Sequence, residues 1–266
     1  MILLTGYSGD IGSSIRSIAQ LEKIKLGRLR FPRVELAAKN NLLSQLIAVH
    51  TAARKNGVKV SVFHLGHPAT DASVEEYRTF YRNSLVLFSS CRYLGIPLYF
   101  ASSASCYLEN QSFYSNFKRS LEVAARLNGH QSIRLGIFTG NKDDNTTFRR
   151  ISLVCRVLVG TGFSRLVQDT AFFTFGEREL LSLLIEFELD YGDLTNSSYI
   201  RYLISGERKS ASEIFLSRSK QVRLSLPFVQ REYILHLLGS MPRVTVPGRF
   251  DAFVNFLHGH KLEEVN

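Results

Sequence analysis

"MILLTGYSGDIGSSIRSIAQL", residues 1–21, is the stretch on which the fold prediction depends. The apolar run at 1–5 predicts a short buried strand, and the residues that follow the glycines have the apolar spacing of a helix. Between them lie Gly6, Gly9 and Gly12. Glycines allow a tight turn and let backbone N–H groups approach a phosphate, which a helix N-terminus also attracts. The stretch therefore predicts a strand, a phosphate-binding turn and a helix, as at the start of a dinucleotide-binding domain.

The stretch about 20 residues beyond this turn bears on the choice of dinucleotide. An NAD site usually offers a carboxylate there to the ribose hydroxyls. This sequence has KLGRLRFPRVEL at 25–36, with Arg28, Arg30 and Arg33 before its first carboxylate, Glu35. Because a guanidinium can bind a 2′-phosphate through two hydrogen bonds, the sequence favours NADP over NAD.

Helical and apolar stretches alternate along the next hundred residues. Helices are predicted over 35–56, 73–94 and 114–129, and strands over 58–66, 96–105 and 131–140. Such alternation predicts an α/β fold, a Rossmann-type doubly wound parallel sheet with ligands at the carboxyl ends of the strands. The serines of 102–105 follow one such end, and Gly66 and His67 follow another.

The sequence predicts two parts of unequal regularity. Residues 1–140 are expected to form the dinucleotide-binding Rossmann domain, and 141–266 a smaller C-terminal substrate-binding region. In this second part, 148–160 and 177–189 have the pattern of helices, and TAFFTF at 170–175 that of a strand close to the cofactor. Part of 165–190 is expected to return to the Rossmann sheet.

Composition excludes several classes of protein. A chain of 266 residues with 45% apolar side chains can bury a large core. The sequence contains no run of 18 or more apolar residues, so no membrane span is expected. The N-terminus has no basic leader, and three widely spaced cysteines favour a reducing cytoplasm without a metal site. Basic residues give a net charge of +10 but are scattered. They favour small phosphorylated ligands over nucleic acid.

FYSNFKRS at 113–120 places Tyr114 and Lys118 one helical turn apart. On its own this pair is as easily explained by a solvated helix face. A neighbouring cation can lower the pKa of a tyrosine from about 10, so the pair is also a candidate for acid–base chemistry. The order of the surrounding motifs decides between the two interpretations.

That order resembles the extended branch of the short-chain dehydrogenase/reductase family, which contains nucleotide-sugar epimerases, dehydratases and 4-keto-reductases. The resemblance covers most of the chain and is strongest over 1–140. Its motifs are Thr-Gly-x-x-Gly-x-x-Gly at Thr5–Gly12, His-x-Ala-Ala at His64–His67, a helix asparagine at Asn83, Ser-Ser-x-x-x-Tyr in YFASSASCY, Tyr-x-x-x-Lys at Tyr114–Lys118 and an Arg-Pro-x-x-x-x-Gly strand at IRLGIFTG.

The resemblance implies that Tyr114 is the catalytic acid–base, that Ser103 orients the substrate oxygen, with Ser105 as an alternative hydroxyl, and that Lys118 tunes Tyr114 and binds ribose. It further implies a cytoplasmic enzyme that binds NADP or NAD and a nucleotide sugar. The implied cofactor-binding residues are Gly6, Ser8, Gly9, Asp10, Ile11, Gly12, Arg30, Arg33, Leu65, Gly66, His67, Asn83, Tyr114, Lys118, Leu135 and Ile137.

Departures from the family narrow the expected activity. Ala104 and Ser105 replace the Asp-Glu pair of the dehydratases, which leaves epimerisation or 4-keto reduction in polysaccharide precursor synthesis. Ser103 and Tyr114 are only eleven residues apart, and the stretch between the first strand and 58–66 is short. These changes leave open a non-catalytic NADP(H)-binding sensor or scaffold of the same fold.

Resembling proteins form homodimers through the two helices expected here at 73–94 and 114–128. Phe80, Leu85 and Leu87 are apolar enough for such an interface, but they would serve an internal core equally well, so the homodimer is expected by analogy alone.

Overall fold

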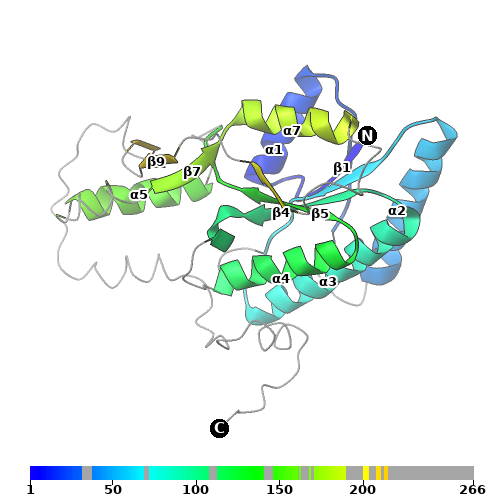
Figure 1. Ribbon diagram of the computed structural model, residues 1–266, viewed down its shortest axis with the longest axis horizontal. Helices are drawn as coiled ribbons and strands as arrows, with labels where there is room; N and C mark the ends of the chain where they lie inside the picture. The colour runs from blue at the N-terminus through cyan, green and yellow to red at the C-terminus, as the bar shows by residue number, and fades with distance from the viewer. Residues whose placement is uncertain are drawn as a thin grey trace, which may run out of the picture.

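A six-stranded parallel sheet lies at the centre of the structure, a computed structural model (Figure 1). The order of the strands is β2-β1-β3-β4-β5-β8, and every neighbouring pair is parallel. Their bounds are Ile2–Thr5 for β1, Leu26–Arg28 for β2, Ser61–His64 for β3, Leu98–Ser103 for β4, Gln131–Leu135 for β5 and Ile200–Leu203 for β8. The residues that the structure describes are 1–31, 38–68, 72–107, 113–140, 146–160, 162, 168, 171–189, 200–203, 208–210 and 213–214.

Helices cover both faces of this sheet. Figure 1 shows α1 (Asp10–Leu21) and α7 (Glu177–Leu189) on one face, and α2 (Ala38–Lys55), α3 (Val74–Leu94) and α4 (Phe113–Leu127) on the other. Each face has its own apolar core, so that all four residues of β1 and of β3 are buried. Parallel strands buried on both faces read as continuous apolar runs, which is why the sequence pattern identified them. The predicted Rossmann-type α/β fold is confirmed.

The strand order reverses between β1 and β3. The chain leaves β1 for β2 on one side, then crosses through α2 to β3 on the other side of β1. In the described part of the chain β2 is the edge strand. The common dinucleotide-binding fold, with strand order 3-2-1-4-5-6, has one more strand beyond this position. The short stretch between β1 and β3 therefore corresponds to one strand–helix unit fewer. Ligands of open α/β sheets bind where the order reverses, at the carboxyl ends of the strands. Here that point is the glycine turn after β1.

The predicted strand at 131–140 is divided in two. β5 joins the central sheet, whereas β6 (Ile137–Phe138) pairs with β7 (Ala171–Phe175) in a second sheet that β9 (Arg208–Ser210) completes. The residue between β5 and β6 is Gly136. The TAFFTF segment thus forms a strand, but it pairs with β6 rather than with the central sheet. From the region 165–190 it is α7 that packs against the Rossmann layer, through α1 and the core cluster around Leu183, Leu184 and Phe187.

Local signals explain the bounds of α3, and its burial bears on the expected dimer. The side chain of Ser73 accepts a hydrogen bond from the Glu76 backbone while Glu76 accepts one from the Ser73 backbone, and Gly95 ends the helix at φ 65°. Phe80 and Leu87 belong to the core. Their apolar character therefore reflects internal packing, and they are not available to a dimer interface.

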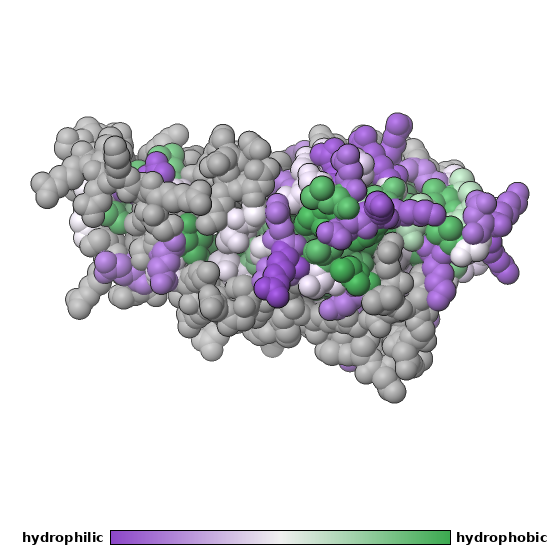
Figure 2. All heavy atoms as spheres, turned by 90° about the horizontal axis from the view of Figure 1, so that it is seen from above, coloured by the Kyte–Doolittle hydropathy of each residue, from purple (hydrophilic) through white to green (hydrophobic). Residues whose placement is uncertain are grey.

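The face formed by α1 and α7 is mixed in character. Figure 2 shows apolar side chains gathered between polar ones on this side, where Leu21 of α1 and Ile185 of α7 are exposed. No helix among the described residues is both long and apolar enough to cross a membrane. A further helix is α5 (Thr146–Gly160).

Candidate active site

The turn from β1 to α1 depends on two glycines. Gly6 has φ 67°, in the left-handed region, and a Cβ there would lie 3.0 Å from the backbone nitrogen of Gly66. A Cβ on Gly12 would lie 2.3 Å from the carbonyl oxygen of Gly6. The helix begins after Gly9, which offers no side chain to cap the first turn. The N-terminus of a helix attracts anions, and phosphate oxygens suit its backbone N–H groups.

A hydrogen-bonded chain through His64 fixes the turn to the neighbouring strand. The Gly66 N–H donates to Thr5 Oγ1, which lies 2.6 Å from His64 Nδ1, and His64 Nε2 lies 3.1 Å from Ser84 Oγ. Because Ser84 donates its own proton to the Phe80 carbonyl, its oxygen accepts from Nε2, and Nδ1 accepts from Thr5. Burial lowers the pKa of His64 to about 3, so the ring is neutral. The carboxyl ends of β1 and β3 are held together beside the glycine turn.

One cavity connects the glycine turn with the predicted catalytic residues. It has a volume of about 370 Å³ and extends from Gly6 and Gly12 to Ser103, Tyr114 and Lys118. Ser103 ends β4, and the other two lie in the first turns of α4. Three segments that are far apart in the sequence therefore meet at one site.

Tyr114 is hydrogen-bonded to Ser103 and packed beneath the cavity surface. Burial raises its pKa to about 12, and the hydrogen bond with Ser103 offsets only part of this effect. The expectation that Lys118 lowers the pKa of Tyr114 is therefore wrong for this structure. The physical reason is that desolvation disfavours the phenolate, while Lys118 Nζ lies 6.0 Å from the centre of the ring.

Lys118 is directed toward the backbone. Its Nζ donates a hydrogen bond of 2.9 Å to the carbonyl oxygen of Ala101 and lies 4.9 Å from the centre of the Phe100 ring. The side chain is only 3% exposed, and burial lowers its pKa to about 8. Near neutral pH the site thus holds a protonated phenol beside an ammonium group.

His67 occupies the position of an alanine in the family motif and lines the same cavity. Its Nδ1–H donates to the carbonyl oxygen of Pro68, and its ring packs edge-on against Tyr114, with 5.0 Å between ring centres. Burial lowers its pKa to about 3. Among the described residues nothing pairs with the buried Nε2, which in this tautomer is an acceptor.

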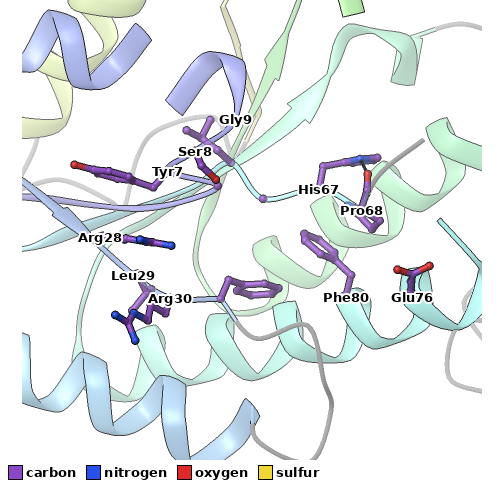
Figure 3. A pocket seen from close by; sticks show the side chains of 14 residues that line it. Tyr7, Ser8, Gly9, Arg28, Leu29, Arg30, His67, Pro68, Glu76 and Phe80 are labelled. Atoms are coloured by element: carbon purple, nitrogen blue, oxygen red, sulfur yellow. Dashed lines mark hydrogen bonds between the residues drawn. The ribbon is translucent and has the colours of Figure 1, made fainter. Parts of the chain in front are cut away.

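A second, larger cavity of about 700 Å³ lies on the other side of the glycine turn, toward β2 (Figure 3). Arg28 points into it beneath the ring of Tyr7, whereas the side chain of Arg30 points away from the glycine turn. The backbone of Arg30 is held by Gln45. Glu76, which also lines this cavity, is engaged in capping α3. The cavity therefore offers the guanidinium of Arg28 with little competition from the Glu76 carboxylate.

The structure brings most of the predicted site residues together. The smaller cavity is lined by Gly6, Gly9, Asp10, Ile11, Gly12, Leu65, His67, Ser103, Tyr114, Lys118, Leu135 and Ile137, and the larger one also by Ser8, Arg30 and Gly66. Asn83 is buried in α3 and lines neither cavity. Arg33 and the side chain of Ser105 lie outside the described residues.

Sequence reasoning missed several residues of the site. Arg28 was noted in the 25–36 stretch but was not named as a ligand, although its side chain is the one that points into the larger cavity. Ser102 and Glu122 were also missed. Glu122 follows Tyr114 and Lys118 at a spacing of four residues, so the helical repeat places all three on one side of α4. That spacing was a signal for it.

Comparisons with known proteins agree with this architecture. No family model matches the sequence, and no curated protein does. Among solved structures, dTDP-4-dehydrorhamnose reductase from Yersinia enterocolitica matches with a TM-score of 0.58 at 14% identity, over 81% of this chain and 78% of that one. UDP-N-acetylglucosamine 4-epimerase from Bacillus cereus matches with 0.56 at 14% identity, over 80% and 78%.

A third match has a nicotinamide cofactor bound. It is RMD from Pseudomonas aeruginosa complexed with NADPH, with a TM-score of 0.54 at 16% identity, over 80% of this chain and 78% of that one. These neighbours cover both parts of the chain, so the likeness is not confined to the glycine turn. The chain has a Rossmann-type α/β fold that is similar to the folds of these solved nucleotide-sugar enzymes.

Proposed function

We propose that this chain is an NADP(H)-dependent reductase of nucleotide-linked 4-keto sugars, with Tyr114 as the proton donor. The observation that carries the proposal is the single cavity that joins the glycine turn to Ser103, Tyr114 and Lys118. A serine, a tyrosine and a lysine at the carboxyl end of a parallel sheet, next to a phosphate-binding turn, suit carbonyl reduction.

The residues of both cavities fit a dinucleotide. The turn leaves N–H groups for the pyrophosphate, and the larger cavity beside β2 can accept the adenosine half. Arg28 supports NADP over NAD because a guanidinium pairs with a phosphate more strongly than with a hydroxyl. When bound, the cofactor supplies a hydride from its nicotinamide ring.

The protein's own groups then align and protonate the substrate. The Ser103 hydroxyl and the Tyr114 phenol, which are hydrogen-bonded to each other, both face a carbonyl oxygen placed in the cavity. As negative charge develops on that oxygen, Tyr114 donates its proton, and the ammonium group of Lys118 stabilises the resulting phenolate. Ser103 keeps the oxygen in place by a second hydrogen bond.

The protonation state of Tyr114 favours reduction over epimerisation. Epimerisation at C4 begins by removing a hydroxyl proton, which needs a base. Because burial raises the pKa of Tyr114 to about 12, the phenol is protonated near neutral pH. Keto reduction begins with a proton donor instead, and the phenol is present in full.

Replacing Tyr114 by phenylalanine tests the proposal. The Tyr114→Phe variant should lose at least about 10²-fold in kcat for NADPH oxidation with a 4-keto sugar, the usual contribution of a positioned acid. Its affinity for NADPH, measured by calorimetry, should stay close to that of the wild type. Tyr93→Phe, at an exposed position of α3, is the matched control.

The substrates for this assay are UDP-, GDP- and dTDP-linked 4-keto sugars. A variant as active as the wild type would contradict the role of Tyr114. NADPH binding without turnover on any of the three substrates would favour the alternative of a non-catalytic sensor. The hydrogen bond from Lys118 to the Ala101 carbonyl favours this alternative, because it directs the ammonium group toward the backbone. The homodimer remains a prediction.

A further inference from the structure

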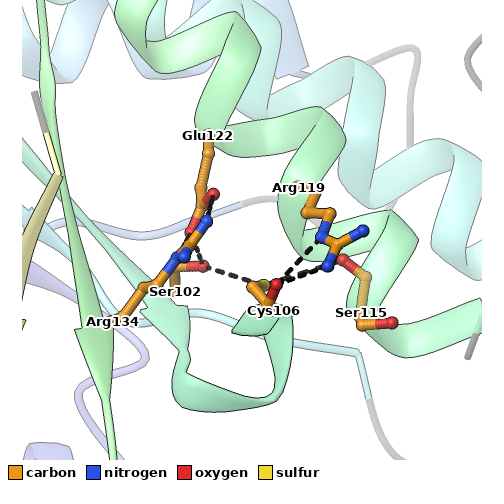
Figure 4. Close-up of polar contacts among 6 residues, drawn as sticks. All are labelled: Ser102, Cys106, Ser115, Arg119, Glu122 and Arg134. Carbon is orange, nitrogen blue, oxygen red and sulfur yellow. Dashed lines mark hydrogen bonds and ion pairs between the residues drawn. The ribbon is translucent and has the colours of Figure 1, made fainter. Parts of the chain in front are cut away.

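Three side chains of α4 hold the end of β4 and the turn that follows it. Lys118 donates to the carbonyl of Ala101, Glu122 accepts a 2.5 Å hydrogen bond from the hydroxyl of Ser102, and Arg119 donates through both Nε and Nη2 to the carbonyl of Cys106 (Figure 4). These contacts join α4 to consecutive parts of the segment that carries Ser103. The relative position of helix and strand end is thus set by direct contacts.

Arg134 of β5 completes the cluster from the neighbouring strand. Its Nε and Nη2 each donate a 2.8 Å hydrogen bond to one carboxylate oxygen of Glu122. The side chains are 6% exposed for Glu122 and 13% for Arg134. A paired fork of this kind in a buried setting fixes orientation as well as charge. Figure 4 shows the carboxylate between the guanidinium of Arg134 and the hydroxyl of Ser102.

Glu122 is connected to the candidate catalytic residues in two ways. Through Ser102 it holds the residue immediately before Ser103, and side chains alternate along a strand, so that fixing one fixes the direction of the next. Through the helix it lies on the same side of α4 as Lys118 and Tyr114. The cluster was not required by the proton transfer proposed above.

We propose that Glu122, held by Arg134, is a positioning residue that fixes the end of β4 against α4, and with it the positions of Ser103 and of the Lys118 side chain relative to Tyr114. The proposal rests on the catalytic roles given under the proposed function. Its structural part, the link from Glu122 to Lys118, can be tested without any substrate.

The charges around Lys118 single out Glu122. Burial lowers the pKa of Lys118 to about 8, and the Cys106 thiol and Glu122 raise it again. Burial also raises the pKa of the Cys106 thiol, which disfavours its charged form. Of the two groups that support the ammonium charge of Lys118, Glu122 is therefore the one to test. The titratable or charged groups around Lys118 and Glu122 are Tyr114 on α4, Cys106 in the turn Ala104–Tyr107, His64 and His67 at the end of β3, and Arg134 on β5.

The test follows the titration of Lys118 Nζ by NMR on protein labelled with ¹⁵N-lysine, with the signal assigned by its loss in Lys118→Met. Glu122→Gln keeps the size and the hydrogen bonds of the side chain but removes its charge, and Glu122→Asp keeps the charge. Because Glu122→Gln leaves Arg134 without its partner, Glu122→Gln combined with Arg134→Met provides a version without an uncompensated buried charge. Glu75→Gln, in the exposed pair with Arg78, is the control.

We expect the midpoint of Lys118 to fall below about 8 in Glu122→Gln, to recover in Glu122→Asp and to stay unchanged in Glu75→Gln. In the double variant, which loses one charge of each sign, the midpoint should lie closer to that of the wild type than in Glu122→Gln. In the reductase assay Glu122→Gln should lose roughly tenfold to hundredfold in kcat, the scale that a misplacement of about 1 Å costs. An unchanged midpoint in folded Glu122→Gln would overturn the proposal. Loss of the folded state in both Glu122→Gln and the double variant would also overturn the proposal, because Glu122 and Arg134 would then be required for folding rather than for positioning. Failure of the proposed function can be distinguished from failure of this proposal. If the proposed function is wrong, the wild type shows no turnover, but the effect of Glu122 on the titration of Lys118 is still observed.

Discussion

Replacing Gly12 by alanine should damage the fold of the glycine turn itself. The new Cβ would lie 2.3 Å from the carbonyl oxygen of Gly6 and 3.0 Å from two backbone atoms of Tyr7. A normal contact requires about 1 Å more, and backbone atoms of a tight turn cannot move that far without shifting α1. Overpacking costs typically 1–3 kcal/mol, and a contact as short as this one with backbone atoms belongs to the upper half of that range. The better helix propensity of alanine returns up to about 1 kcal/mol, which leaves a net loss of about 1–2 kcal/mol.

Gly9→Ala provides the matched comparison at the same turn. Its Cβ would meet only the Gly6 carbonyl, at 3.4 Å, and Gly9 has φ −75°, which any residue can adopt. For a chain of this size, 1 kcal/mol corresponds to about 2–4 °C in Tm. Differential scanning calorimetry should therefore show a Tm about 2–8 °C lower for Gly12→Ala and little change for Gly9→Ala. NADPH affinity should fall in both if the turn cradles a pyrophosphate. Equal Tm values for the two variants would refute the steric argument.

Two further predictions concern the site. Only the cationic form of Lys118 stabilises the phenolate, so kcat should be constant below pH 8 and fall as the pH rises through about 8. This fall would occur well below the pKa of Tyr114, which burial raises to about 12. A pH–rate profile that stays flat to pH 10 would contradict this prediction. Arg28→Ala should weaken NADPH by tenfold or more, as expected for the loss of a charge-assisted hydrogen bond, while leaving NADH nearly unchanged; equal losses for both cofactors in calorimetry would remove Arg28 from the 2′-phosphate site.

The fold was predictable because its strands are buried on both faces. Continuous apolar runs and the helices between them identified β1, β3 and β4 within a few residues. The division of 131–140 was not predictable, because β5 and β6 follow one another with only Gly136 between them and differ in their partners, β8 and β7. The crossing of the chain from β2 to the far side of β1 likewise depends on packing rather than on local pattern.

The site was predictable in position but not in electrostatics. Spacing placed Tyr114 and Lys118 on one helix turn, and motif order placed them opposite the glycine turn, as the cavity shows. The direction of the Tyr114 pKa depends on how deeply the phenol is buried, which no spacing reveals. Burial likewise decides the orientation of Lys118, because a nearly enclosed ammonium group must find an acceptor, here the carbonyl of Ala101.

The short interval between Ser103 and Tyr114 also has a physical interpretation in this fold. A longer connection would leave the distance between the two hydroxyls to be set by packing of the loop. Here α4 contacts the end of β4 through Lys118, Arg119 and Glu122, so the connection is not needed to set that distance. For the function proposed above, the short interval would therefore bear on which substrate is accepted, whereas the contacts that join α4 to the end of β4 do not depend on its length.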